Sequence, residues 1–285
     1  GGPFDACINW TPPSTFEGMD KMNSGTKPTV IISTDLDGTL LGRGNYELTN
    51  ALPQLLVEKA SKYEVIWVIN TGRRFSSVFD VVDRANVVRR PDYLVDRETF
   101  LYKLDGEKYE PVRDWNEWAE QRVDGVQRAV APYLEDWERR IYEEFPGARV
   151  RLDSGVPISV QASDVVQGMR VREALASWTR ALPGIQIIRN AVWVAIWAEG
   201  CDKGSVLAEI SRRHGVPLNR IMAVGDSDND LPMLAPGVCG FPVAPANAEV
   251  SVKDFVAGAG GWVSTEPDID GVLDGVQRFF SQLGA

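Results

Sequence analysis

The chain has 285 residues, of which 44% are hydrophobic and 25% are charged, and this balance is ordinary for a folded globular protein. Its 40 acidic residues against 30 basic ones give a net charge of −10, which makes it a poor general binder of nucleic acid or of anionic membranes. No apolar run approaches the ~20 residues needed to cross a bilayer, and the three cysteines are too scattered for a disulfide framework or a CxxC metal site. We expect a cytoplasmic protein with no membrane segment, monomeric or in a small homo-oligomer.

Residues 1–27 are rich in Gly, Pro, Ser and Thr, and they show no basic start followed by an apolar core. This composition argues against a secretory signal and predicts an N-terminal extension. The folded part of the chain is therefore expected to begin at residue 28.

The first third of the chain alternates predicted strands and helices. Apolar, β-branched runs predict buried strands at 28–34, 64–70 and 92–95, with helical spacing over 47–62 and 74–84 between them. Continuous apolar strands separated by helices are typical of a parallel sheet covered on both faces.

The last third repeats this order. Helices are predicted at 203–214 and 229–235, strands at 220–225 and 238–243, and a closing helix at 269–282. The two ends of the chain therefore form the halves of one Rossmann-like, doubly wound α/β core.

The middle of the chain is richer in hairpins. An Asp-Gly turn at 105–106 predicts a hairpin over 99–112, and two amphipathic helices follow within 115–144. A strand, a helix and a strand pair complete the region at 156–162, 166–181 and 185–198. We interpret the middle as a smaller α/β domain inserted into the core, and place the core at 28–110 and 199–285 and the inserted domain at 111–198.

Four polar clusters follow predicted strands or begin predicted helices, where ligands bind in open α/β sheets. They are residues 35–39, 70–73, 202–205 and 225–230. Each has an ordinary explanation as a turn, a helix start or a helix cap. The last resembles a calcium loop, but Leu231 and Gly237 stand where an EF-hand needs Gly and Glu. Together, at one sheet edge, the clusters indicate a functional site.

The residue types favour phosphoryl transfer. Asp35 and Asp37 alternate at a strand end, so one carboxylate can be the nucleophile and the other the acid and base. A carboxylate that attacks a phosphate dianion needs its charge neutralised, and Mg²⁺ held by Asp35 and Asp226 would do this. Lys203 adds a positive charge, and Thr71 can donate a hydrogen bond to a phosphoryl oxygen.

The order DLDGT, TGR, Lys203 and GDSDND resembles the haloacid dehalogenase-like superfamily in its phosphatase branch. The long separation of Thr71 from Lys203 is similar to the Cof-type and sucrose-phosphate-phosphatase-like group, in which the inserted domain is a large cap. The resemblance implies that Asp35 forms an aspartyl-phosphate. It also implies that Asp37 protonates the leaving alcohol and then activates the hydrolytic water.

The resemblance further implies the ligand set of the site. Mg²⁺ would be held by Asp35, the backbone carbonyl of Asp37 and Asp226, with Asp230 in support. The phosphoryl group would be bound by Thr71, Gly72, Lys203 and Asn229.

The expected substrate is a small phosphorylated metabolite. A sugar phosphate is favoured, and the family suggests one like sucrose-6-phosphate or a glycosyl-phosphoglycerate. Six tryptophans fall in or near the cap: Trp115, Trp118, Trp137, Trp178, Trp193 and Trp197. Their rings suit a sugar, but their spacing is also typical of core residues, and the core interpretation is favoured.

Two other functions stay open at this point. A phosphomutase or phosphotransferase of the same superfamily would return the phosphoryl group to another hydroxyl, and a non-catalytic protein would only bind phosphate. His214, the single histidine, ends a predicted helix and is expected to be a capping cation. That role excludes Ser-His and histidine-ligated zinc mechanisms.

Overall fold

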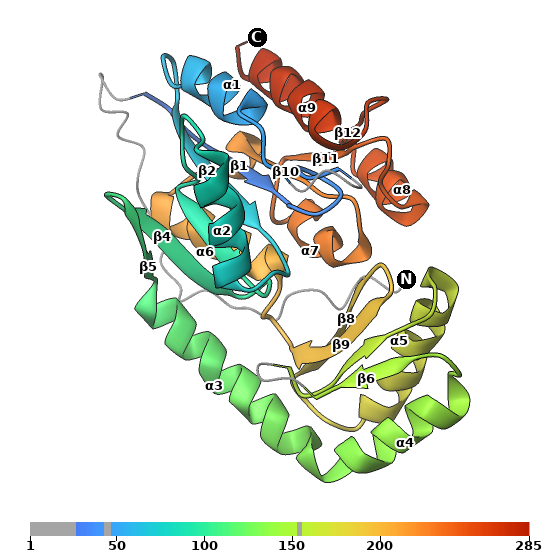
Figure 1. Ribbon diagram of the computed structural model, residues 1–285. Helices are drawn as coiled ribbons and strands as arrows, with labels where there is room; N and C mark the ends of the chain where they lie inside the picture. The colour runs from blue at the N-terminus through green and yellow to red at the C-terminus, as the bar shows by residue number, and fades with distance from the viewer. Residues whose placement is uncertain (1–26, 43–46, 153–155, 285) are drawn as a thin grey trace.

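The computed structural model describes residues 27–42, 47–152 and 156–284. Within them the chain forms an eight-stranded sheet and a four-stranded sheet, each with its own helices (Figure 1). The predicted extension, residues 1–27, lies outside the described residues except for Lys27. No helix in the described ranges is both long enough and apolar enough to span a membrane.

The larger sheet has the strand order β12-β11-β10-β1-β2-β3-β4-β5. Its strands from β12 to β3 run parallel, and β4 and β5 extend it as an antiparallel hairpin. The bounds are β1 Thr29–Thr34, β2 Glu64–Asn70, β3 Tyr93–Asp96, β4 Phe100–Asp105, β5 Lys108–Pro111, β10 Ile221–Val224, β11 Phe241–Ala244 and β12 Trp262–Val263.

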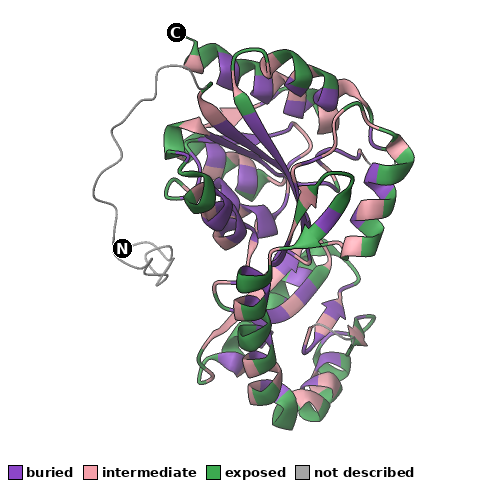
Figure 2. Ribbon diagram, turned by 90° about the vertical axis from the view of Figure 1, so that its left-hand side faces the viewer, coloured by how far each residue is buried: buried purple, intermediate pink, exposed green. Residues whose placement is uncertain are grey.

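Helices cover both faces of this sheet because successive strand residues point to opposite sides. Val30 and Ile32 of β1 pack on one side and Ile31 packs on the other, all fully buried. The first side is covered by α1 Ala51–Lys59, α2 Phe75–Ala85 and α9 Asp268–Leu283. The second is covered by α6 Lys203–His214, α7 Leu231–Leu234 and α8 Val250–Gly258. Figure 2 shows the resulting buried strands between helices with exposed outer faces.

The smaller sheet is antiparallel throughout, with the order β6-β7-β9-β8. Its bounds are β6 Arg149–Arg151, β7 Ser159–Gln161, β8 Ile185–Asn190 and β9 Trp193–Ala198. It packs with α3 Arg113–Val130, α4 Leu134–Glu144 and α5 Val165–Thr179 around a separate apolar core. Short 3₁₀ turns complete the chain at Ala131–Tyr133, Leu218–Arg220 and Asp228–Asp230.

The predicted fold class, a doubly wound parallel core with an inserted smaller α/β domain, is confirmed. The hairpin over 99–112, which the sequence analysis describes with the middle region although the predicted core extends to residue 110, pairs with β3 and so belongs to the core sheet. The short elements β6, α8 and β12 were not predicted. The domain boundaries at 110–111 and 198–199 stay a prediction.

Candidate active site

The site is centred on Asp35, the first residue after β1. β1 lies between β2 and β10, and the Asp35 backbone N–H continues the pairing by donating to the Val224 carbonyl at 3.0 Å. The strand therefore carries the Asp35 carboxylate to the middle of the sheet edge, where the residue is only 5% exposed. A carboxylate so deeply buried needs a charged partner.

Lys203 supplies that partner. Its Nζ lies 2.5 Å from Asp35 Oδ1 and 2.6 Å from Asp230 Oδ1, and the lysine is completely buried. Lys203 is the first residue of α6, which Asp202 and Ser205 cap reciprocally. Asn70, at the end of β2, donates from Nδ2 to the Lys203 carbonyl at 2.9 Å. The cap and this bond fix the start of α6 and hence the ammonium group.

Three carboxylates converge beside the ammonium group. One oxygen from each of Asp35, Asp226 and Asp230 lies within 4.8 Å of the others. Burial raises the pKa of Asp35 well above its ordinary value, Lys203 opposes the rise, and Asp230 adds to it. Burial and the charge of Asp230 raise the pKa of Asp226 to about 7. One ammonium does not balance three carboxylates, so the cluster has the charge and the oxygen ligands to hold a divalent cation.

The turn after β10 places Asp226 and Asp230. Asp230 Oδ2 accepts from the backbone N–H groups of Asp226, at 2.9 Å, and Ser227, at 3.0 Å. Gly225 leaves room for this bond, because a Cβ at that position would overlap the Asp230 carboxylate. Thr39 donates from Oγ1 to Asp226 Oδ1 at 3.1 Å. The motif GDSDND therefore folds back on itself and exposes one acidic face to Asp35.

Asp37 has a different environment. Its carboxylate accepts two hydrogen bonds from Arg73, at 2.5 Å from Nη2 and 2.8 Å from Nε, and its side chain is 47% exposed. Gly38 allows the turn that follows, since its φ is +82° and a Cβ there would overlap the Asp226 carboxylate. The Asp37 side chain is not part of the three-carboxylate cluster.

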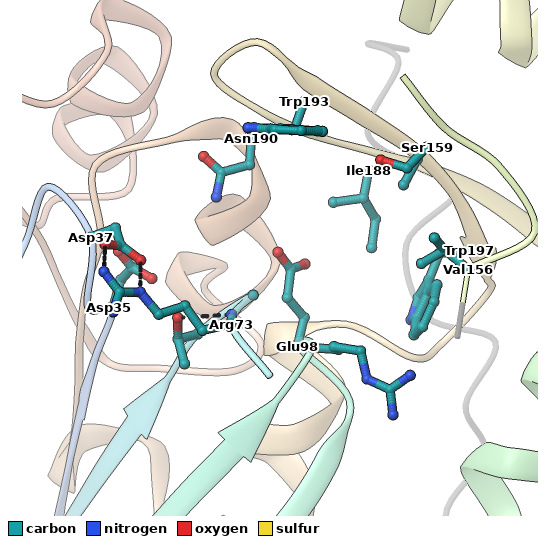
Figure 3. Close-up of a pocket in the computed structure, with 14 residues that line it drawn as sticks. Asp35, Asp37, Arg73, Glu98, Val156, Ser159, Ile188, Asn190, Trp193 and Trp197 are labelled. Atoms are coloured by element: carbon teal, nitrogen blue, oxygen red, sulfur yellow. Dashed lines mark hydrogen bonds and ion pairs between the residues drawn. The ribbon is translucent and has the colours of Figure 1, made fainter. Parts of the chain in front are cut away.

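A pocket of about 370 Å³ opens between this sheet edge and the smaller sheet (Figure 3). Asp35, Asp37, Thr71 and Gly72 line its core side. The opposite side is formed by β7, β8 and β9, which contribute Ser159, Ile188, Asn190, Trp193, Ala195 and Trp197. The pocket thus lies between the buried Asp35 and a mixed aromatic and polar wall.

Glu98 is a pocket residue that the sequence analysis missed. It is 6% exposed, and burial raises its pKa to about 7 against the lowering effect of Lys203. Asn229, whose role in phosphate binding stays a prediction, donates from Nδ2 to Glu98 Oε1 at 2.9 Å. No motif marks Glu98, because its position depends on contacts with the Thr71 loop far away in the chain.

The smaller sheet also contacts the core through Arg189, a second residue that the sequence analysis missed. Its guanidinium reaches Asp228 at 2.6 Å and Glu249 at 2.5 Å, and its side chain is 2% exposed. These contacts tie β8 to the turn that carries Asp230.

Other predictions have mixed outcomes. Trp115, Trp137 and Trp197 are buried as core residues, whereas Trp193 is 36% exposed and lines the pocket together with Trp197. His214 lies in the last turn of α6, as predicted, and its role as a capping cation stays a prediction. Burial lowers its pKa below the ordinary value, and its Nε2 lies 2.9 Å from the Tyr93 hydroxyl.

Comparison with known proteins assigns the family. The sucrose-6F-phosphate phosphohydrolase family matches residues 28–139, and the haloacid dehalogenase-like hydrolase family matches residues 176–275. The two matches include all four polar clusters. The chain belongs to the haloacid dehalogenase-like superfamily.

Two relatives are phosphoglycolate phosphatases of archaea. The one from Methanoculleus marisnigri is 32% identical over 99 residues, 35% of this chain and 40% of the relative. The one from Archaeoglobus fulgidus is 25% identical over 257 residues, 86% of this chain and 95% of the relative. The chain matches 40% of the length of the Methanoculleus protein. It also matches 40% of the length of a relative from Methanothrix thermoacetophila.

Solved structures share the fold of this superfamily member. The sucrose-phosphatase of Synechocystis, in complex with sucrose and phosphate, has a TM-score of 0.65 at 16% identity, covering 88% of this chain and 98% of that one. Trehalose-6-phosphate phosphatase of Aspergillus fumigatus has a TM-score of 0.54 at 14% identity, covering 89% and 92%.

Proposed function

We propose that the protein is a Mg²⁺-dependent phosphatase that hydrolyses a small phosphorylated metabolite through an aspartyl-phosphate on Asp35. The observation that carries the proposal is the position of Asp35, which is buried at the end of a central strand, contacts Lys203 and opens to a pocket. The family and the phosphatase names of the relatives support the same reaction.

The cation would be held by Asp35 and Asp226, with the Asp37 carbonyl and Asp230 completing the site. The residues fit, because the buried carboxylates of Asp35 and Asp230 and the partly buried carboxylate of Asp226 lie within 4.8 Å of one another, with one ammonium group beside them. When bound, Mg²⁺ supplies charge neutralisation between the nucleophile and the phosphoryl oxygens.

The reaction divides into two displacements. Asp35 forms a bond to phosphorus while the ester P–O bond breaks, and Asp37 gives its proton to the departing alkoxide. Water then attacks phosphorus and releases Asp35, and Asp37 takes the proton that water loses. In this structure the Asp37 carboxylate pairs with Arg73, so Asp37 must exchange that partner for the leaving-group oxygen. Lys203 and Thr71 would stabilise the phosphoryl oxygens.

The substrate class we propose is a sugar phosphate, either like sucrose-6-phosphate or like a glycosyl-phosphoglycerate. The pocket supports this class, because Trp193 and Trp197 offer aromatic surface and Ser159 and Asn190 offer polar groups. A cytoplasmic location is part of the proposal. Of the three scattered cysteines, the two that the structure describes, Cys201 and Cys239, are buried free thiols, as expected in a reducing compartment.

The test is phosphate release by Asp35→Asn in the presence of Mg²⁺, with Asp124→Asn, an exposed position on α3, as the matched control. The wild type and the control should release inorganic phosphate from a hexose phosphate, and Asp35→Asn should lose at least about 10³-fold in kcat. Retained turnover in Asp35→Asn would show that another group is the nucleophile. Appearance of an isomerised sugar in place of free phosphate would indicate a mutase instead.

A further inference from the structure

The wall of the pocket contains one carboxylate oxygen with no partner. Glu98 Oε1 accepts from Asn229, but Oε2 is buried and makes no hydrogen bond to any described residue. Figure 3 shows the Glu98 carboxylate pointing into the pocket, between Asp37 and Arg73 on one side and Trp197 on the other. A buried acceptor left unpaired is costly, and a ligand in the pocket can supply its donor.

The backbone holds Glu98 there under strain. Arg97 and Glu98 both have left-handed conformations, with φ of +51° and +61°, which non-glycine residues rarely adopt. Two backbone bonds keep them in place: Glu98 N–H donates to the Thr71 carbonyl and Arg97 N–H to the Arg73 carbonyl, each at 2.9 Å. Strain maintained in this way is concentrated at functional sites.

Glu98 also lies against the loop proposed to bind phosphate. A Cβ added at Gly72 would come within 3.1 Å of Glu98 Oε1. Its neighbour Arg97 also lines the pocket, but the Arg97 guanidinium pairs with Asp96 at 3.2 Å and covers the ring of Phe100 at 4.8 Å. At the pH of 8 used in the test below, Glu98 therefore presents a hydrogen-bond acceptor with negative charge at this point of the pocket.

We propose that Glu98 is a specificity-determining residue whose free oxygen accepts a hydrogen bond from a hydroxyl group of the alcohol that leaves. The proposal rests on the phosphatase function proposed above and deepens it. An uncharged, polyhydroxylated alcohol satisfies Glu98, whereas an alcohol that carries a carboxylate, such as glycolate, meets like charge. Of the two sugar-phosphate candidates, the geometry favours the one without a carboxylate.

The test compares kcat/KM for phosphate release from three esters at pH 8 with Mg²⁺. Glucose 6-phosphate offers hydroxyls, 2-phosphoglycolate offers a carboxylate, and phenyl phosphate offers neither. Glu98→Gln should lower kcat/KM for glucose 6-phosphate about 10- to 100-fold, because a bond to a charged acceptor is lost. The same variant should change kcat/KM for phenyl phosphate by less than about threefold. It should not lower kcat/KM for 2-phosphoglycolate.

Two further variants keep the result interpretable. Glu98→Gly suits the positive φ of this position, so it should fold and show the same selective loss. Glu173→Gln, at an exposed position of α5, should match the wild type with all three esters.

Several outcomes would overturn the proposal. The role of Glu98 is contradicted if Glu98→Gln lowers kcat/KM equally for all three esters or lowers it for none. It is also contradicted if the wild type prefers 2-phosphoglycolate to glucose 6-phosphate. In those cases phosphate release by the wild type still upholds the phosphatase function. If the wild type releases phosphate from no ester, both proposals fail.

Discussion

Lys203→Met removes a completely buried ammonium group while keeping most of the length of the side chain. In the wild type this group contacts Asp35 at 2.5 Å and Asp230 at 2.6 Å. The substitution leaves the buried carboxylates of Asp35 and Asp230 and the partly buried carboxylate of Asp226 close together, with no ammonium group beside them. We therefore expect a loss of stability that depends strongly on pH and on Mg²⁺.

The magnitude follows from the burial of both partners. Removing one member of a buried ion pair costs about 3–5 kcal/mol, because the remaining charge is left desolvated and unpaired. The pKa of Asp226 is already about 7 in the presence of Lys203, and loss of the ammonium group raises it further. Because the pKa of Asp226 is higher in the folded protein than in the unfolded chain, the free energy of unfolding falls as the pH rises towards the folded-state pKa. The stability that Lys203→Met loses should therefore reach about 3–5 kcal/mol near pH 8 and become smaller towards pH 5.

The assay is urea unfolding in EDTA at pH 5 and pH 8, repeated at pH 8 with Mg²⁺. Lys253→Met is the matched control, since Lys253 Nζ donates to the Ala246 carbonyl at 3.1 Å and forms no ion pair with any described residue. Mg²⁺ at about 100 times its Kd should restore about 2.7 kcal/mol to Lys203→Met. A deficit below about 1 kcal/mol at pH 8, or one that is the same at pH 5, would refute the reasoning.

Three further predictions concern neighbouring residues. Gly225→Ala should displace the Asp230 carboxylate and weaken Mg²⁺ binding at least about tenfold, seen as a loss of the Mg²⁺-induced rise in Tm. Arg189→Met should leave Glu249 unpaired at the contact between the two sheets and split the calorimetric unfolding into two transitions; a single unchanged transition would contradict this. Glu98→Gln should gain about 2–3 kcal/mol over the wild type between pH 5 and pH 8 in EDTA, because the pKa of Glu98 rises from an ordinary 4.5 to about 7 on folding. If the free energy of unfolding varies with pH in the same way for the two proteins, burial does not raise the pKa of Glu98 as argued.

The central strands could be predicted because their apolar runs are local. The expected strand at 64–70 and β2 coincide, and 28–34 differs from β1 by one residue. The sheet that contains the hairpin 99–112 could not be predicted in the same way. Its place in the larger sheet depends on the pairing of β4 with β3, in which Leu94 lies opposite Tyr102 across a tight turn. Local periodicity shows that a hairpin forms and does not show what lies beside it.

The same distinction applies to the site. The four polar clusters could be found because each directly follows a strand or begins a helix, and the structure brings Asp35, Lys203, Asp226 and Asp230 together. Their catalytic roles stay a prediction. Glu98 could not be found, because its left-handed backbone is stabilised only by the loop that approaches it in space.

The contacts of Arg189 with Asp228 and Glu249 affect how fast a ligand can enter and leave the pocket. They join the β8 side of the pocket to the core, and we call this set of contacts the clasp. If a ligand can enter and leave only while these contacts are broken, they slow its association and its dissociation by the same factor. A variant with a weaker clasp would then bind its ligand faster and release it faster. The clasp would set how long a substrate remains beside Asp35.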